Sequence, residues 1–544
     1  MPARKLITYN QVFVSTNCGE RRLNWNLVTP FFRQAVDQPC RSALSVGGTE
    51  FSYQELAARA NAIAAWLDGR KEEPAARVGI LAARSWEAYA GLLGACWHGA
   101  AYVPFNPRLP EARLAWLLEF TGLDALIVDT QGLERLSGSV ARACPRHILA
   151  PAIHAPGRRP GLAYAICGSE ALPCDGPLTR PADRKAGDLA YIIFTSGTTG
   201  TPKGVMVTNG NVAAFLAALR ERYAFGPHDR VAQANELSFD NSIFDVFNAW
   251  SAGASLNIVP AAQAMGPLHF IRSHDLTVWF SVPSTAIFMQ RMKMLLPGTL
   301  PSLRYSAFAG EALPVATAQA WRAAAPNSIL DCLYGPTETT VVCTGDRFSD
   351  EVHTTESRGI VSIGKPFPGM EARILDESLN VVPQGTPGEL AFSGSQVARG
   401  YFRNAEQSAA RFRLLDGNIW YLTGDLAYQD QTGLYHHLGR TDNQVKVNGY
   451  RVELEEVEAH LRTVCCTDSV AVVAWPMAHG TAAGLVAFVS GVETGTGEIR
   501  EGMKARVPAY MVPARVHSLP ALPATANGKC DRKTLIGLLE QGAL

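Results

Sequence analysis

Residues 191–205 read YIIFTSGTTGTPKGV, and this stretch decides how the rest of the chain is interpreted. An apolar strand leads into a loop of hydroxyl residues and glycines. Glycine lets backbone N–H groups approach an oxyanion, serine and threonine hydroxyls donate to phosphate oxygens, and a lysine adds positive charge. The stretch therefore predicts a phosphate-binding loop, whose members are Thr195, Ser196, Gly197, Thr198, Thr199 and Lys203.

The loop differs from a Walker A motif. That motif needs Gly-Lys followed by Ser or Thr, whereas this chain has Pro202, Lys203 and Gly204. A flexible hairpin or linker is the alternative interpretation. Glycines at 197, 200 and 204, with four hydroxyl residues between 195 and 199, favour phosphate binding.

Helical and strand-like segments alternate on either side of this loop. Residues 53–69 have the pattern of an amphipathic helix, and 77–83 and 123–130 are apolar runs of strand length. Such alternation favours parallel sheets covered by helices. Residues 151–188, rich in Pro, Gly and Arg, predict a surface connection. We therefore expect an α/β fold whose large N-terminal domain contains parallel-rich, helix-covered sheets.

Near residue 440 the sequence changes to a compact unit. A turn at 448–451, a Glu-rich helix at 452–462 and two apolar strands at 469–476 and 484–491 follow one another. About 100 residues are enough for a small α+β domain. We predict a large domain, 1–441, and a small one, 442–544, with the boundary inside GRTDNQ.

Charge and composition exclude several classes of partner. Lys+Arg and Asp+Glu are both 49, so no net positive field attracts nucleic acid or an acidic membrane. The first residues lack the apolar core of a secretory signal, and no run of about 18 apolar residues follows. We expect a cytoplasmic protein without nucleic-acid or membrane partners. The 11 cysteines contain no C-x-x-C pair, which favours reduced thiols over a zinc site.

Further motifs follow the phosphate loop along the chain. They are LYGPTETT (333–340), GELAFSGSQVARGY (388–401), YLTGDLAYQDQTGLYHHLGRTDNQVKVNGYRVELEEVE (421–458) and NGKCDRKTL (527–535). In content, order and spacing, the set resembles a stand-alone nonribosomal peptide synthetase adenylation domain of the acyl-adenylate-forming superfamily. The resemblance implies an AMP-forming ligase that uses ATP and Mg²⁺ to activate an amino acid, with release of pyrophosphate.

The resemblance also implies roles at the nucleotide. Glu338 would hold Mg²⁺, Thr337 would donate to the α-phosphate, and Tyr334 would stack on adenine. Asp425 would accept both ribose hydroxyls, and Arg440 would reach the ribose side. Taken without the resemblance, the Gly and Pro of the YGPTE segment are as typical of a simple turn as of a binding loop. An Asp that follows a Gly, as Asp425 does, is more often a turn or helix-cap residue.

Lys529 matches the lysine that bridges the substrate carboxylate and the nucleotide while the adenylate forms. By composition alone it would be a solvated lysine of the tail. Since it belongs to the small domain, the resemblance implies a mobile small domain that closes for the first half-reaction and rotates for the second. Asp442 corresponds to the hinge, and the turn around Gly449 to the face presented to a carrier's pantetheine arm.

The segment SFDNSIFD, 238–245, indicates which acid is activated. Asp240 aligns with the aspartate that pairs with the substrate's α-ammonium group in amino-acid-activating relatives, although a surface aspartate is the alternative. The rest of the predicted pocket wall carries no charge and consists of Asn241, Phe244, Ser281, Ala307, Ala309, Leu333, Val341 and Val342. We expect a neutral amino acid of small to medium size, with proline or valine ahead of alanine and serine, because a charged one would need a buried partner.

Transfer of the aminoacyl group is the second expected step. Since no carrier segment follows Lys529 in this sequence, we expect a peptidyl or acyl carrier protein to bind in trans. An acid:CoA ligase is one alternative, and competition between coenzyme A and carrier thiols distinguishes it. A non-catalytic nucleotide-binding regulator is another, but the presence of Lys203, Glu338, Asp425 and Lys529 together argues against it, because a sensor would not need the full set. A luciferase-like oxygenase shares the fold.

Overall fold

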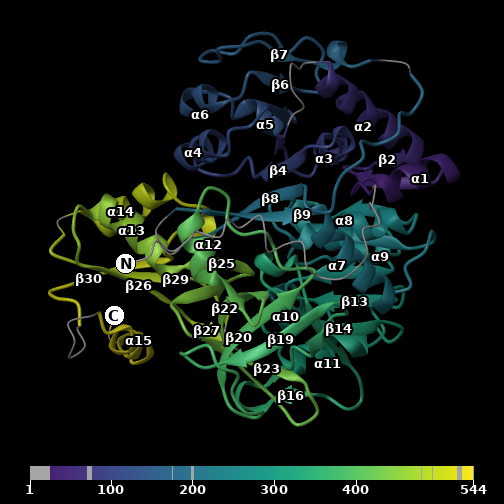
Figure 1. Cartoon of the computed structure of the whole chain (residues 1–544). Coiled ribbons are helices and arrows are strands. Elements are labelled where there is room, and N and C mark those ends of the chain that lie inside the picture. Colours follow the sequence, from purple (N-terminus) through teal and green to yellow (C-terminus); the bar gives the residue numbers. More distant parts are fainter. Residues whose placement is uncertain are drawn as a thin grey trace, which may run out of the picture.

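A large domain with three sheets lies beside a smaller C-terminal unit (Figure 1). The computed structural model describes residues 25–69, 76–173, 176–197, 201–478, 481–492, 494–523, 530–542 and 544. The expected α/β class, with a large sheet-rich domain and a small α+β domain, is confirmed. No helix in these ranges is long and apolar enough to cross a bilayer.

The phosphate-binding loop lies at one edge of a seven-stranded sheet. Its strands, in spatial order, are β7 (Ile166–Cys167), β6 (His147–Leu149), β5 (Ala125–Val128), β3 (Arg77–Leu81), β4 (Ala101–Phe105), β8 (Leu189–Thr195) and β9 (Lys203–Thr208). Pairing is parallel except in the β8–β9 hairpin, where Thr195 pairs with Lys203. This hairpin brings the two ends of the predicted loop together. The accompanying helices are α2 (Tyr53–Asp68), α3 (Trp86–His98), α4 (Glu111–Thr121), α5 (Thr130–Glu134), α6 (Gly138–Ala143) and α7 (Asn209–Arg222).

A nine-stranded sheet carries the predicted substrate pocket. Its strands, in spatial order, are β18 (Lys365–Pro366), β15 (Thr344–Phe348), β14 (Ile329–Tyr334), β13 (Tyr305–Phe308), β12 (Val278–Ser281), β10 (Arg230–Gln233), β11 (Ser255–Ile258), β1 (Ser42–Val46) and β2 (Thr49–Ser52). The central strands are parallel, so their carboxyl ends meet at one edge. The helices of this part are α1 (Thr29–Asp37), α8 (Asn241–Ser251), α9 (Leu268–Ser273), α10 (Pro283–Arg291) and α11 (Val315–Ala324).

The third sheet is antiparallel and leads into the small domain. It contains β19 (Met370–Leu375), β20 (Gly388–Gly394), β22 (Asn418–Gln429), β21 (Phe412–Leu415) and β23 (Tyr435–Arg440), with α12 (Ala405–Arg411) beside it. A separate two-stranded ladder joins β16 (Thr354–Thr355) to β17 (Ile360–Val361). Because β22 pairs with β23, Asp425 lies directly opposite Arg440.

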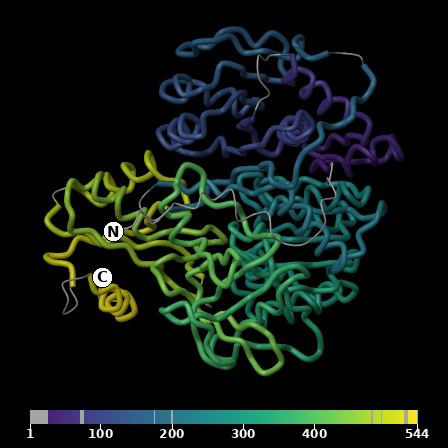
Figure 2. Tube along the Cα trace, in the orientation of Figure 1, coloured from purple at the N-terminus to yellow at the C-terminus, as the bar shows by residue number. Residues whose placement is uncertain are grey.

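The small domain begins just after β23. Its helices are α13 (Leu454–Cys465), α14 (Thr496–Lys504) and α15 (Arg532–Glu540). Its two sheets are β25 (Tyr450–Glu453), β24 (Gln444–Val447), β28 (Thr481–Ala482) and β27 (Met477–Ala478), and β26 (Val470–Ala474), β29 (Leu485–Ser490) and β30 (Arg515–Leu519). Apolar side chains of α13, α14 and β26 form a core of their own. The tube in Figure 2 shows this C-terminal part folding back beside the third sheet.

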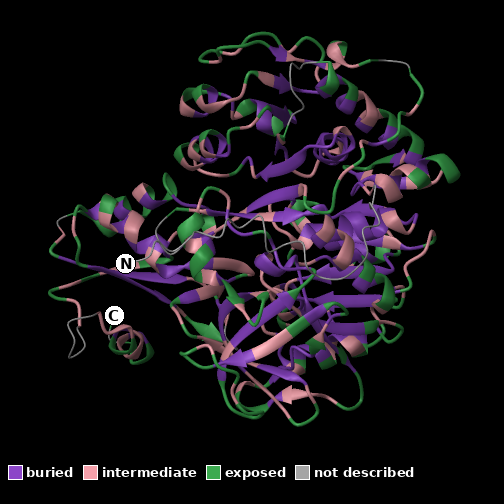
Figure 3. Cartoon of the chain, viewed as in Figure 1, coloured by how far each residue is buried: buried purple, intermediate pink, exposed green. Residues whose placement is uncertain are grey.

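The sequence patterns locate most elements to within a few residues. The amphipathic pattern at 53–69 is α2, and the apolar runs near 80 and 125 are β3 and β5. The Glu-rich helix begins at Leu454 and not at 452, because Val452 and Glu453 pair with β24 as part of β25. Figure 3 shows the central strands buried and the outward faces of the helices exposed. The cysteines in the described ranges are free thiols, as expected.

Candidate active site at the domain interface

A cavity of about 350 Å³ lies where the large and small domains meet. Its walls come from the end of β14, the start of α8, the strands β22 and β23, and the small-domain strands β24 and β25. The cavity is lined both by residues predicted to contact the nucleotide and by residues predicted to contact the amino acid. These are Thr195, Ser196, Asp240, Asn241, Leu333, Tyr334, Thr337, Asp425 and Arg440. Segments more than 200 residues apart in the chain therefore converge on one space.

Asp240 presents a carboxylate to this cavity. It stands at the N-terminus of α8 but makes no capping hydrogen bond with its side chain, although aspartate usually caps a helix there. Its buried Oδ2 atom accepts no hydrogen bond from the described residues. Burial raises the pKa of this carboxyl to about 6, against the lowering effects of the Thr337 side chain and of Lys446. An unsatisfied buried carboxylate of this kind is suited to an ammonium ligand.

Most of the predicted pocket wall belongs to one apolar cluster. Phe244, on α8, packs against Phe280 of β12, with ring centroids 4.2 Å apart and ring planes tilted by 32°. The same cluster holds the buried side chains of Ala307, Ala309, Leu333, Val341 and Val342. Asn241 lies at the rim near Gly310. Of these predicted wall residues, Asn241 and Leu333 line the cavity, whereas Phe244, Ala307, Ala309, Val341 and Val342 belong to the buried cluster and are not among the lining residues.

Ser281 lies on the opposite face of the sheet. It pairs with Phe308, which packs on Trp321, whereas Phe280 pairs with Ala307 and faces α8. The Ser281 hydroxyl accepts a hydrogen bond from the Trp279 indole at 2.9 Å and donates to the Val282 carbonyl at 3.2 Å. On β12, Phe280 therefore faces the side of α8 and Ser281 faces the other side, and neither of them is among the residues that line the described cavity. An apolar run does not reveal which of two neighbouring residues faces which side of a sheet.

Asp425 organises the other end of the cavity. Arg440 donates to its Oδ1 atom at 3.0 Å, His437 Nε2 lies 3.3 Å from the same atom, and the Tyr334 hydroxyl donates to Oδ2. Burial acts to raise the pKa of this carboxyl, but Arg440 and His437 outweigh burial and hold it well below its usual range. Arg358 donates to His437 Nδ1 at 2.7 Å, so the imidazole presents its Nε2–H to Asp425. A fixed, ionised acceptor for hydroxyl groups results.

The phosphate loop is described up to Gly197 and again from Thr201, so Thr198 and Thr199 lie outside the described residues. A Cβ atom at Gly197 would stand 2.0 Å from the Thr201 carbonyl oxygen, which only glycine avoids. Lys203 is buried at the end of the loop, and burial lowers the pKa of its amine. Its ammonium lies 5.5 Å from the centre of the Tyr401 ring.

Glu338 lies next to the phosphate loop and is completely buried. The Tyr401 hydroxyl donates to its Oε1 atom at 2.7 Å, and Arg451 of the small domain donates to Oε2 at 3.0 Å. Burial alone would raise the pKa of this carboxyl, but Arg451 and Lys203 bring it down to about 2. An ionised, buried carboxylate beside a phosphate loop has the donor chemistry that Mg²⁺ requires.

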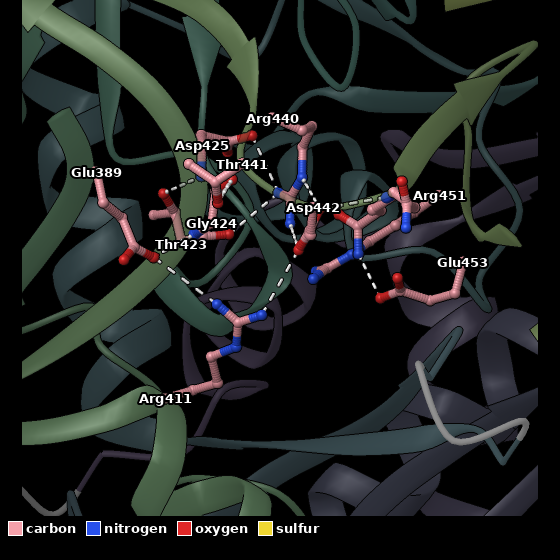
Figure 4. Close-up of polar contacts among 12 residues, drawn as sticks. Glu389, Arg411, Thr423, Gly424, Asp425, Arg440, Thr441, Asp442, Arg451 and Glu453 are labelled. Atoms are coloured by element: carbon pink, nitrogen blue, oxygen red, sulfur yellow. Dashed lines mark hydrogen bonds and ion pairs between the residues drawn. The ribbon is translucent and has the colours of Figure 1, made fainter. Parts of the chain in front are cut away.

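The predicted hinge, Asp442, is held by two arginines. Arg440 donates two hydrogen bonds to its carboxylate, at 2.8 and 2.6 Å, and Arg411 lies 3.5 Å away. Figure 4 shows Asp442 between Arg440 and Arg411, with Glu389 on the far side of Arg411. Both arginines belong to the large domain, so Asp442 is anchored to β23 and α12 at the point where the chain leaves that domain.

Lys529 lies outside the described residues, so the structure does not place it. A different lysine of the small domain, Lys446 on β24, lines the cavity. Burial and the nearby Arg451 lower the pKa of its amine, and Asp425, Glu311 and Asp240 oppose that shift. Nothing in the spacing of the sequence distinguishes this lysine from others, since only the docking of the small domain brings it to the cavity.

Known proteins share both the sequence and the fold of this chain. The family model of the AMP-binding enzymes matches residues 31–402, and the model of the AMP-binding enzyme C-terminal domain matches 456–529. Tyrocidine synthase 3 of Brevibacillus parabrevis is 33% identical over 93% of this chain, which spans only 8% of that protein's length.

Solved structures match over nearly the whole chain. The adenylation domain AlmE of Vibrio cholerae, solved in complex with glycyl-adenosine-5'-phosphate, is 30% identical with a TM-score of 0.84. That match covers 97% of this chain and 99% of AlmE. IdnL7 is 34% identical with a TM-score of 0.69, covering 96% of this chain and all of its own.

Proposed function

This chain belongs to the AMP-binding enzyme family, and we propose that it activates a small neutral amino acid as its adenylate and then transfers it to a carrier thiol. The observation that carries the proposal is that Asp240 and Asp425 both line the same cavity. An aminoacyl adenylate has an ammonium group at one end and ribose hydroxyls at the other. The cavity offers one carboxylate for each.

Adenylation brings together anions that repel one another. A carboxylate oxygen of the amino acid attacks the α-phosphorus of ATP, and the bond to pyrophosphate breaks. The loop at Ser196, Gly197 and Lys203 would hold the departing phosphates, and Glu338 would hold Mg²⁺. When bound, the ion supplies positive charge to the phosphate oxygens. Asp240 anchors the amine, which orients the attacking carboxylate.

Transfer is the reaction that the described orientation of the domains supports. The turn at Gly449 reaches the large domain, where its N–H donates to Glu311 and its Cα lies against Val282. It thereby forms part of the cavity wall. A pantetheine thiolate entering here would attack the acyl carbon, and AMP would leave as the acyl–phosphate bond breaks. We propose that a peptidyl or acyl carrier protein in trans supplies this thiol.

We propose that the side chain of the substrate extends from Asp240 toward Phe244, which lies one turn further along α8. Phe244 and Phe280 are both buried, with ring centroids 4.2 Å apart, and these two aromatic side chains would limit the depth available to the substrate. The hydroxyl of Ser281 bonds elsewhere and does not select a polar side chain. We therefore place glycine, alanine and serine ahead of proline and valine, toward the small end of the expected range.

Exchange of labelled pyrophosphate into ATP tests the proposal. We expect exchange that depends on Mg²⁺ and on a small neutral amino acid, because adenylation is reversible while the adenylate stays bound. A methylene more or less changes selectivity by about 1 to 3 kcal/mol, so neighbours in size should be measurable. Absence of exchange with every amino acid in a broad panel would refute the activity.

Phe280→Ala tests the pocket floor in the same assay. Removing the ring opens space beneath the substrate, so the preference should move toward valine, leucine or phenylalanine by about tenfold or more, the scale of one or two methylene groups. Ser281→Ala is the matched control, since its hydroxyl faces the opposite side of the sheet, and the order of preference should persist. A shift in Ser281→Ala alone would show that the assigned register of the pocket is wrong.

A further inference from the structure

The small domain occupies the phosphate side of the active site with charges of its own. Arg451, on β25, donates from Nη1 to both oxygens of Glu338, at 3.3 and 3.0 Å. Glu338 is fully buried, so it requires a cation nearby whatever the state of the enzyme. In the proposed function that cation is Mg²⁺, and here the guanidinium takes its place.

Carboxylates of the small domain contact the groups that would bind phosphate. Glu453, also on β25, lies with Oε1 3.6 Å from the ammonium of Lys203. Glu456, on α13, accepts a hydrogen bond from the Gly197 N–H at 3.1 Å. The Ser196 hydroxyl donates to the backbone carbonyl of Arg451 at 2.9 Å. The two carboxylates and the backbone carbonyl contact these groups as phosphate oxygens would, and the Arg451 guanidinium contacts Glu338 as a metal cation would.

We propose that Arg451, Glu453 and Glu456 are an internal substitute for magnesium pyrophosphate, so that docking of the small domain and binding of that product exclude each other. The inference rests on the proposed function, because it takes Glu338 as the metal ligand and the loop as the phosphate site. Figure 4 shows Arg451 and Glu453 beside the hinge network of Arg440 and Asp442. Gln444 connects the two, because its backbone N–H donates to Asp442 and its side-chain amide donates to Glu453.

The arrangement gives the enzyme an order of events. While magnesium pyrophosphate is bound, Arg451 loses Glu338 and Glu453 loses Lys203 as a partner, so the docked orientation that exposes the cavity to a thiol is disfavoured. Once pyrophosphate and the ion leave, Glu338 and Lys203 need new partners, which the small domain supplies. The coupling is reciprocal, so whatever weakens docking must tighten the binding of magnesium pyrophosphate.

The docked state is also easy to displace. Glu453 accepts a hydrogen bond from the Gln444 amide at 2.5 Å on Oε1, but its buried Oε2 accepts none from the described residues. A buried oxygen without a hydrogen-bond donor weakens the contact that it belongs to. This carboxylate therefore holds Lys203 without binding it as tightly as a phosphate would.

Calorimetric titration of magnesium pyrophosphate into Arg451→Met tests the proposal. Competition predicts that this variant binds about five- to twentyfold more tightly than the wild type, the usual scale of coupling between sites. A direct phosphate-binding role for Arg451 predicts the reverse, because a positive charge is lost. Arg462→Met, which removes an arginine paired with Glu458 on the far part of α13, is the matched control and should bind as the wild type does.

A second measurement avoids variants altogether. Phe239 of the large domain packs against Tyr450, with ring centroids 5.3 Å apart, so its oxidation in hydroxyl-radical footprinting reports undocking. In the wild-type protein, magnesium pyrophosphate should increase that oxidation, while pyrophosphate with a chelator should not. Weaker or unchanged binding by Arg451→Met, or unchanged oxidation of Phe239, would overturn the inference. Neither measurement uses an amino acid, so failure to find a substrate leaves their result intact.

Discussion

In the proposed function, recognition of the substrate's amine would rest on Asp240. Its Oδ2 atom is buried without a hydrogen-bond donor among the described residues, and the side chain of Thr337 hydrogen-bonds to this carboxyl. Such a group is unfavourable in the free enzyme and would become favourable when an ammonium group binds. This local destabilisation would select for amines.

The raised pKa of Asp240 predicts a pH dependence. Burial holds that pKa at about 6, so the ionised form that pairs with ammonium is lost as the pH falls through 6. The KM for the amino acid should therefore rise about tenfold for each pH unit below that value, since one proton competes with the ligand. Exchange assays between pH 5 and 8 give this KM directly.

Two controls accompany this measurement. The KM for ATP should stay level over the same range, because Arg440 and His437 keep Asp425 ionised throughout. Asp240→Asn should bind the amino acid poorly at every pH. A parallel rise of both KM values on acidification would point to general loss of structure.

Among the elements, the connection between β23 and β24 contains the predicted hinge. Asp425 and Arg440 pair across β22 and β23, and Arg440 then holds Asp442 with two hydrogen bonds. The two residues proposed to bind the nucleotide are therefore joined directly to the predicted hinge. Rotation at Asp442 would be expected to disturb this contact.

Asp442→Pro should impair thioester formation more than pyrophosphate exchange. Proline fixes φ near −65° and so restricts rotation about the hinge, while one closed orientation remains accessible. Asp442→Ala separates the two effects, because it removes the ion pair with Arg440 and leaves the backbone free. We expect thioester formation to fall in the order wild type, Ala, Pro, measured with a labelled amino acid and carrier protein. Equal loss of both half-reactions in the proline variant would exclude a hinge role.

At the scale of the whole molecule, the proposed function places two different lysines at one reaction centre. Lys446 lines the cavity in the described orientation, while Lys529, near the other end of the small domain, is the lysine implied for adenylation. A single fixed orientation of the two domains would not require both lysines. A rotation of the small domain about Asp442 would bring them to the substrate in turn.

Lys529→Ala should therefore act on one half-reaction only. Loss of a well-placed charge donor typically removes about 2 to 4 kcal/mol of transition-state stabilisation, so exchange should fall by at least about thirtyfold. Transfer from a chemically supplied aminoacyl adenylate should be spared. Single-turnover assays of the two steps compare them directly, and Lys533→Ala, on the following helix, is the control. A matching fall in transfer would show that the lysine serves both orientations.

Local signals were enough to predict the fold class, the phosphate loop and the polar residues of the site. The hydroxyl residues and glycines at 195–199 indicate phosphate binding by their residue types alone. The periods of helices and strands are likewise local properties of the chain. Asp240, Asp425 and Arg440 were found through motifs of a known family, and the structure brings them to one cavity. The roles of these residues, and the hinge at Asp442, remain predictions for experiment.

Long-range packing decided what the sequence could not. Whether Phe280 or Ser281 faces α8 depends on how β12 is oriented in the sheet beside β13, because neighbouring side chains on a strand point to opposite faces. The contacts of Arg451 with Glu338 and of Glu453 with Lys203 depend on how two domains dock. By itself, the sequence determined which chemical groups are present. Only the tertiary structure decided which of them meet, because those partners lie more than 100 residues apart and no local pattern encodes their distance.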